Sequence, residues 1–282
     1  MRRRTPLLLA APLAALPLLG ADAVNPGVVF EITTTHHDQT PPRTEVGRVQ
    51  IEGANLAMAI EGPDGGGRLI YRGEAGEMVM ESPAEGTYTV IDEATLERLS
   101  GQINAAMAEM ERMLENLPEE QRAMVRQMQE RGGMPGMPGM GAMELPEVET
   151  RPTGRSETRN GYPVDEWEVL EDGEVVRRMW VTPWGEIDGG DEARQAMLGM
   201  VEFFDAFLEA MPPMPGGGPM IRNPFRNMDV TGGMPVWTAE IAADGSVERE
   251  SELTSVERTT LPVSTFEPDP SLTERPLPDM GG

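Results

Sequence analysis

Methionine is the residue that is most unusual in this chain, in number and in spacing. Among its 22 copies, Met134, Met137 and Met140 recur every third residue in a segment rich in proline and glycine, and Met143 follows them. Thioether sulfurs are soft ligands that suit Cu(I) or Ag(I). Methionine also adapts to irregular apolar surfaces, so the same residues could form an exposed loop or an apolar flap. A soft-metal site at these four residues is therefore an alternative hypothesis.

A second group of apolar residues has helical spacing in two separate stretches. A helix with a single apolar stripe needs a surface to cover, and methionine gives a pliable lining that suits a flexible, lipid-like ligand. Plain core packing is the competing interpretation. We expect the following residues to line a cavity for a hydrophobic ligand: Leu99, Ile103, Met107, Met110, Met197, Val201 and Phe204.

Other reactive residue types are scarce. All 23 basic residues are arginine and cysteine is absent, which excludes Schiff-base lysines, thiolate nucleophiles and cysteine metal sites. His36 and His37 are neighbours at the end of a predicted strand, where they would face opposite ways, so we interpret them as surface residues. No serine lies in a Gly-x-Ser-x-Gly elbow. We therefore predict no catalytic centre, no enzyme activity and no cofactor.

Tryptophan and arginine have structural interpretations that are simpler than ligand binding. The four tryptophans lie on or beside predicted strands, where such large rings usually anchor a core. Three arginines lie on the first predicted sheet, and one of them could meet a ligand head group. Solvent exposure beside acidic neighbours is the simpler expectation for Arg48, Arg68 and Arg72.

The spacing of apolar residues along the chain indicates which strands and helices position the candidate site residues. Alternation and tight Gly/Pro/Asn/Asp turns predict six short antiparallel strands, at 28–35, 46–51, 55–60, 68–72, 77–81 and 87–91. The period then changes to about 3.5, which predicts a helix from Asp92, a fair N-cap, to residue 117 and a second helix from Pro118. The same order recurs, with strands at 149–159, 162–170 and 174–181, a helix at 191–211, and strands at 236–242, 246–256 and 261–266.

The remaining segments are interpreted as a targeting sequence, loops and a tail. Three arginines, an apolar run interrupted by prolines, and Ala21-Asp22-Ala23 have the layout of a secretory signal peptide, with cleavage after Ala23. The mature chain would carry 20 basic and 47 acidic residues, a net charge of −27, which disfavours nucleic-acid binding. We expect a periplasmic protein that does not span the membrane, with one domain over 24–266, Met/Pro/Gly-rich loops at 132–146 and 211–220, and a flexible Pro-rich tail at 267–282.

Several short motifs resemble those of an exported bacterial family. The segments 67–72, 87–92, 160–164, 180–183 and 233–235 look like domain-of-unknown-function family 4412, which is similar to the outer-membrane lipoprotein carriers LolA and LolB. The resemblance covers 28–92, 147–185 and 234–266. It implies an incompletely closed antiparallel half-barrel whose open apolar face is covered by helices, and a cavity that holds acyl chains.

The fold class expected from the residues agrees with the resemblance: α+β, with a curved antiparallel sheet and amphipathic helices over its open face. We expect a non-enzymatic exported protein that binds a lipid, a lipoprotein acyl chain or another hydrophobic ligand between sheet and helices. A soft-metal binder and an envelope protein-interaction module are the alternatives. The sequence does not predict the ligand or the oligomeric state.

Overall fold

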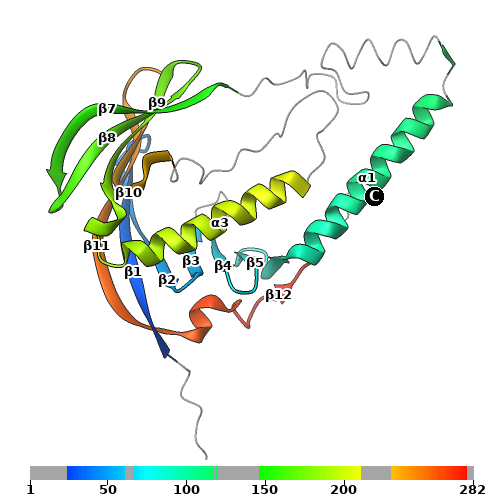
Figure 1. Ribbon diagram of the computed structural model, residues 1–282, viewed down its shortest axis with the longest axis horizontal. Helices are drawn as coiled ribbons and strands as arrows, with labels where there is room; N and C mark the ends of the chain where they lie inside the picture. The colour runs from blue at the N-terminus through cyan, green and yellow to red at the C-terminus, as the bar shows by residue number, and fades with distance from the viewer. Residues whose placement is uncertain (1–23, 61–65, 117, 120–145, 211–229, 278–282) are drawn as a thin grey trace, which may run out of the picture.

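The computed structural model of the protein describes residues 24–60, 66–116, 118–119, 146–210 and 230–277 (Figure 1). The strands are β1 (Val24–His36), β2 (Arg43–Glu52), β3 (Asn55–Ile60), β4 (Gly67–Arg72), β5 (Glu77–Ser82), β6 (Thr87–Ile91), β7 (Val148–Arg159), β8 (Tyr162–Glu171), β9 (Glu174–Pro183), β10 (Gly233–Ile241), β11 (Val247–Pro262) and β12 (Thr273–Glu274). The helices are α1 (Glu93–Glu115) and α3 (Gly190–Ala210), with short 3₁₀ turns η1 (Trp184–Glu186) and η2 (Val263–Phe266).

The twelve strands that the described residues form belong to one curved sheet. Their order is β12-β6-β5-β4-β3-β2-β1-β11-β10-β9-β8-β7, and every neighbouring pair is antiparallel except β12 with β6. The first six strands form a meander, and the later strands form a second one. The two join where β1 pairs with β11 along almost the whole of its length, with Phe30 opposite Val256. This pairing makes one sheet out of the two similar halves of the chain.

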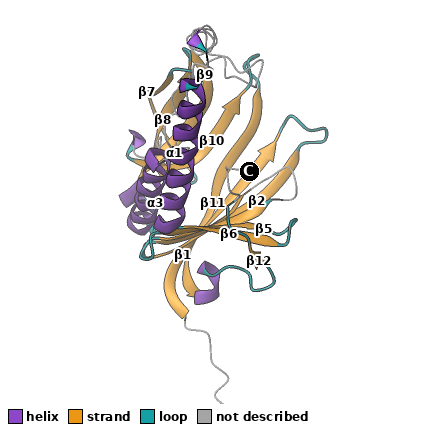
Figure 2. Cartoon of the chain, turned by 90° about the vertical axis from the view of Figure 1, so that its right-hand side faces the viewer, coloured by secondary structure: helices purple, strands orange, loops and turns teal. Residues whose placement is uncertain are grey.

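The first meander follows the alternation that predicts it. On β2, Val49 and Ile51 are buried while Val46 is 63% exposed. Because successive side chains of a strand point to opposite faces, this pattern gives the sheet one covered face along the second half of β2. Both helices lie on that side of the first meander (Figure 2). The predicted fold class, an α+β protein with an open, curved and largely antiparallel sheet and helices over one face, is confirmed.

The second meander curls more strongly. Two-residue hairpin loops join β7 to β8 and β8 to β9, at Asn160-Gly161 and Asp172-Gly173. Both residues of each loop have positive φ, as expected for type I′ turns. The Asn160 amide at the hairpin tip donates to the Glu252 carboxylate (2.9 Å) and to the Leu253 carbonyl (3.0 Å) of β11. Since β9 and β10 lie between β8 and β11 in the sheet, this contact shows that the hairpin curls back across them.

The start of α1 is held by a local cap, and the start of α3 by a residue that is distant in sequence. The Thr95 N–H donates to the Asp92 carboxylate at 2.8 Å, which confirms Asp92 as the N-cap of α1. The start of α3 is held by Arg258 of β11, which pairs with Asp188 (2.7 Å) and with Glu192 in the first turn (2.9 Å). These two hydrogen bonds from Arg258 raise its own pKa, and the bond to Glu192 lowers the pKa of that carboxyl.

The end of the chain differs from expectation in two respects. The predicted strand at 261–266 is wrong beyond Pro262, because β11 continues to Pro262 and the chain then turns into η2. The segment after Glu267 is not loose up to residue 277: Thr273 and Glu274 pair with β6, and Leu277 packs against the main core. The following predicted segments lie outside the described residues: the second helix beyond Glu119, the two Met/Pro/Gly-rich loops apart from Pro146, and the signal peptide.

Candidate functional site

The candidate site is the face of β1–β6 that carries the helices, here called the inner face. Strand register places its side chains in two rows across the strands. The first row is buried throughout and consists of Ile51, Leu56, Tyr71, Met78 and Ile91. The second row, Val49, Met58, Leu69 and Met80, begins buried, but Met58 is half-buried and Met80 is 41% exposed. Cover over the inner face is therefore complete along one row and incomplete along the other.

The first half of α3 lies closely against the sheet. Ala193, Ala196 and Met200 are buried to within about 1% and belong to the same core as the first row. Small side chains let the helix approach the strands, and Gly199 extends this contact, because a Cβ at that position would come within 2.9 Å of the Tyr71 hydroxyl. The protein's own side chains therefore fill the inner face beneath this part of the helix.

The second half of α3 carries three phenylalanines that are only half-buried, Phe203, Phe204 and Phe207. All three pack against the main core. Phe203 lies against Tyr71 with ring centroids 6.0 Å apart, and Phe204 meets Phe207 edge-on at 6.4 Å. Half-buried aromatic rings beside an incompletely covered apolar row are a suitable surface for a flexible hydrophobic ligand.

Tyr71 is a buried polar residue of the first row that contacts Phe203 and Gly199 of α3. Burial raises the pKa of its phenol, and the negative charge of Glu202 raises it further. The hydroxyl is therefore protonated near neutral pH and can donate a hydrogen bond. Tyr71 is not among the site residues predicted from the sequence, although the alternation of 67–72 already places it on the same side as Leu69.

The seven residues expected to line a cavity have different environments. Leu99 of α1 and Met197 of α3 are buried, whereas Ile103, Val201 and Phe204 are half-buried. Met197 belongs to the main core and Phe204 packs against it. The side chains of Met107 and Met110 are outside the described part of the chain. Lining of a cavity by these residues stays a prediction.

The metal hypothesis rests on Met134, Met137, Met140 and Met143, which lie outside the described residues, so it also stays a prediction. His36 ends β1 and is half-buried, whereas His37 is exposed and lies 3.4 Å from the Glu250 carboxylate. Within the described ranges, no group of three or more His, Cys, Asp and Glu residues could hold a metal ion. Likewise, none of the described helices has the length and apolar character needed to cross a membrane.

The tryptophans belong to the structural framework. Trp180 and Trp184 are buried in the main core, Trp237 packs against it, and Trp167 packs against a smaller cluster on β8 and β9. The guanidinium of Arg159, at the end of β7, lies 4.7 Å from the ring centroid of Trp180 and 4.8 Å from that of Trp237. This stack holds the curled hairpin over β9 and β10.

No protein-family model matches the chain, and no curated protein matches its sequence. Among solved structures, the chain is similar to an uncharacterised conserved protein from Thermus thermophilus, with 7% identity and a TM-score of 0.39 over 88% of this chain and 90% of that chain. It is similar to the MucA/MucB complex of Pseudomonas aeruginosa, with 6% identity and a TM-score of 0.33 over 88% of this chain and 57% of that chain.

The chain is also similar to a Vibrio parahaemolyticus domain described as a putative outer membrane lipoprotein-sorting protein, with 9% identity and a TM-score of 0.26 over 86% of this chain and 89% of that chain. TM-scores below 0.5 at these identities carry no argument about function. Membership of family 4412, which the motifs suggest, is not matched by a family model.

Proposed function

We propose that this chain is an exported, non-enzymatic protein that binds a lipid or another hydrophobic ligand between its sheet and its helices. The observation that carries the proposal is the incomplete cover of the inner face. Met58 and Met80 are not fully buried, and the three half-buried phenylalanines of α3 pack against the same core. A ligand there would bury apolar surface that the chain's own described side chains leave partly exposed.

The ligand site is proposed at the second half of α3. The first half has Ala193, Ala196 and Gly199 against the strands and leaves no room for a guest. Phe204 and Met80 would contact the apolar part of the ligand. Its polar end would lie toward solvent, because the Tyr71 hydroxyl is buried against Gly199. The acyl chain of a lipoprotein or a free lipid has this division into apolar and polar parts.

Export is proposed from the signal-peptide pattern at the amino terminus. Cleavage after Ala23 would leave Val24 as the first residue, and Val24 pairs with Pro262 of β11. Processing at this position would therefore keep every described residue of the strand that joins the two meanders. Edman sequencing of the protein recovered from the periplasm is expected to begin at Val24, and recovery of the uncleaved chain in the cytoplasm would contradict the proposal.

Ligand binding can be tested with cis-parinaric acid, a fluorescent fatty acid whose emission rises in apolar sites. The mature chain is expected to bind it saturably. Phe204→Ser should weaken binding by at least about tenfold, because the loss of a buried aromatic side chain costs about 1.5–3 kcal/mol and about 1.4 kcal/mol corresponds to tenfold. Val46→Ser is the matched control, since Val46 is 63% exposed at the far end of β2. Native mass spectrometry of protein purified without detergent is expected to show a co-purified lipid.

Two outcomes would contradict the lipid-binding proposal. One is the absence of saturable binding in a mature chain whose far-ultraviolet circular dichroism shows the mixed sheet and helix content. The other is equal binding by the Phe204→Ser and Val46→Ser variants at equal thermal stability. Met80→Ser provides a second test of the same surface, because Met80 is 41% exposed and its loss should disturb the fold little.

An interaction module is the second candidate, and α1 favours it. The helix contacts β6 and α3 near its start and then extends away from the sheet (Figure 1). Met113 near its end is 61% exposed. If α1 docks on an envelope protein, a photo-crosslinking amino acid at position 113 should capture a defined partner in the periplasm. The same substitution at position 46 should not, and identical crosslinks from both positions would exclude a specific role of α1.

A further inference from the structure

The face of the sheet opposite the helices, here called the outer face, has its own apolar cluster. Ala57, Ile70 and Val79 of β3–β5 are buried there, with Val90 half-buried beside them. The cover comes from the end of the chain, residues 263–277, here called the C-terminal strap. The strap begins at η2, which contacts β3 and β4, and ends beside β6. A sheet face and a sheet edge are thus covered by one terminal segment.

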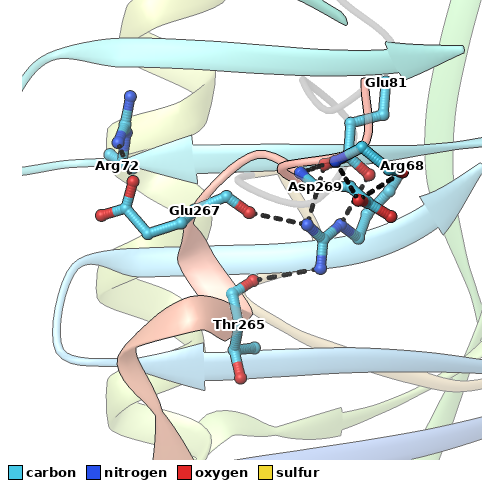
Figure 3. Close-up of polar contacts among 7 residues, drawn as sticks. Arg68, Arg72, Glu81, Thr265, Glu267 and Asp269 are labelled. Carbon is cyan, nitrogen blue, oxygen red and sulfur yellow. Dashed lines mark hydrogen bonds and ion pairs between the residues drawn. The ribbon is translucent and has the colours of Figure 1, made fainter. Parts of the chain in front are cut away.

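Two charged residues of the sheet bind the main chain of the strap (Figure 3). Arg68 of β4 forms a double hydrogen bond with Glu81 of β5 (2.9 and 2.8 Å). The same guanidinium donates to the carbonyls of Thr265 (3.5 Å) and Glu267 (2.7 Å). The Glu81 carboxylate, in a residue only 7% exposed, accepts the Asp269 N–H at 2.7 Å. These three contacts of Arg68 and Glu81 with the strap are to backbone atoms, so they do not depend on the side chains of the strap.

Two side chains of the strap add selectivity. Phe266 is 4% exposed and inserts into the outer cluster. Glu267 pairs with Arg72 at 3.0 Å (Figure 3), and Arg72 also pairs with Glu77 on the neighbouring strand. The outer face therefore offers an apolar pocket for an aromatic ring and an arginine for an acidic residue directly after it.

The strap then extends the sheet by one short strand. The Thr273 N–H donates to the Gly86 carbonyl (3.0 Å) and the Arg275 N–H to the Tyr88 carbonyl (2.8 Å). The Thr89 hydroxyl donates to the Arg275 carbonyl at 2.9 Å. Only Thr273 and Glu274 form β12, so the ladder is far shorter than any other in the described sheet. Addition of an extended segment to a sheet edge is a general mode of peptide recognition.

We propose that the outer face and the β6 edge form a peptide-binding groove, and that the strap is its resident intramolecular ligand. The external ligand would be an extended acidic peptide with an aromatic residue followed by a carboxylate, as in Phe266-Glu267. Arg68 and Glu81 would bind its main chain, Arg72 its acidic side chain, and β6 its edge. The strap would hold the groove closed until such a peptide displaces it. This groove lies on the opposite side of the sheet from the inner face and does not depend on the proposed ligand-binding function.

An attached segment competes at a high effective concentration, so the free groove is accessible only when the strap is weakened. The test uses the full mature chain and a fluorescein-labelled peptide of residues 263–277, with binding followed by anisotropy. Phe266→Ala combined with Glu267→Ala weakens the strap and leaves the groove intact. This variant should bind the peptide at least about tenfold more tightly than the wild type, because tethering contributes factors of this size or more.

A locked variant supplies the opposite perturbation. Thr87 and Thr273 lie opposite each other in the parallel pair, and the chain has no cysteine of its own. Thr87→Cys with Thr273→Cys should form a single disulfide that fixes the strap, abolish peptide binding when oxidised and restore the wild-type value when reduced. Arg68→Ala in the weakened background should abolish binding, and a scrambled peptide should not bind to any variant.

Binding of the scrambled peptide as tightly as the native one would overturn the proposal. So would equal peptide binding by the weakened chain and the oxidised, locked chain. Circular dichroism and thermal unfolding of each variant establish that it is folded before binding is compared. Because cis-parinaric acid reports on the inner face, loss of peptide binding with normal lipid binding separates failure of this groove from failure of the proposed function.

Discussion

Gly199 of α3 lies directly against Tyr71 of β4. A Cβ at Gly199 would lie 2.9 Å from the Tyr71 hydroxyl oxygen and 3.3 Å from a ring carbon. Tyr71 is itself only 5% exposed and lies against Phe203 in a tilted arrangement, so the ring has little freedom to move aside. This contact sets how closely the helix approaches the sheet.

The contact predicts opposite effects for two glycine-to-alanine substitutions. Gly101 of α1 has no atom within 4 Å of a Cβ, so Gly101→Ala should stabilise the protein by about 0.5–1 kcal/mol through helix propensity. Gly199→Ala should instead destabilise it by about 1–3 kcal/mol, because overpacking outweighs propensity. Urea unfolding measures both. Adding Tyr71→Phe to Gly199→Ala should recover part of the loss, and equal stabilisation by both single substitutions would show that the contact is unimportant.

Tyr71 also predicts a fall in stability at alkaline pH. Burial, with a further contribution from the charge of Glu202, raises its pKa in the folded state above the ordinary value of about 10. As the pH rises, the unfolded chain therefore loses the Tyr71 proton before the folded chain does. The contribution of the protonated Tyr71 to the stability of the fold is complete below about pH 10 and is lost as the pH rises through the folded-state pKa. Thermal unfolding from pH 8 to 11 should show a shallower decline for Tyr71→Phe than for the wild type. Tyr162→Phe is the control for loss of a hydroxyl elsewhere, and identical slopes for all three proteins would be the contrary result.

The N-cap of α1 predicts a dependence on acid. Hydrogen bonds from Thr95, through its side chain and its backbone, lower the pKa of Asp92. The capping contribution is therefore present above the unfolded pKa of about 3.9 and is lost as the pH falls through the lower folded value. Asp92→Ala should cost about 1 kcal/mol at pH 7. Asp92→Asn keeps a cap that does not titrate, so the stability of this variant relative to the wild type should improve as the pH falls from 5 to 2. If urea unfolding shows no such relative gain, the cap does not contribute as proposed.

The stack of Arg159 between Trp180 and Trp237 predicts that lysine is a poor substitute for this arginine. The planar guanidinium lies 4.7 and 4.8 Å from the two ring centroids, a geometry that an ammonium group does not reproduce. Arg159→Lys should cost about 1 kcal/mol and should change the near-ultraviolet circular dichroism of the tryptophans. Arg178→Lys on β9, whose side chain is 47% exposed, should change neither quantity. Unaltered tryptophan spectra in Arg159→Lys would mean that the stack does not order the rings.

Local periodicity predicted most of the elements, but not which side of α3 meets the sheet. The sequence places Met197, Leu198, Val201, Phe204 and Leu208 on one apolar side. In the structure the closest contacts come from Ala193, Ala196 and Met200, together with Met197, while Leu198 and Val201 are only half-buried. A prediction from hydrophobic periodicity relies mainly on large apolar side chains. A helix that packs closely on a sheet instead places small side chains, such as alanine, at the contact.

The same limit applies to the candidate sites. Tyr71 and the three phenylalanines lie on different elements and form one surface only because α3 crosses β4. The C-terminal strap has a Pro-rich composition that is typical of a loose tail, and its order comes from Arg68 and Glu81, which are distant in sequence. A local pattern does not encode such contacts.

By itself, the sequence determined the strand meanders, the two long helices, the N-cap at Asp92 and the hairpin turns at Asn160-Gly161 and Asp172-Gly173. Each of these depends on neighbours within a few residues. Only the tertiary structure decided the joining of β1 to β11, the face of α3 that packs and the docking of the strap. Thr33 and Thr254, for example, are hydrogen-bonded across 221 residues of chain. Contacts between residues so far apart in the chain form only when whole strands and helices pack together. A short stretch of sequence therefore does not predict them.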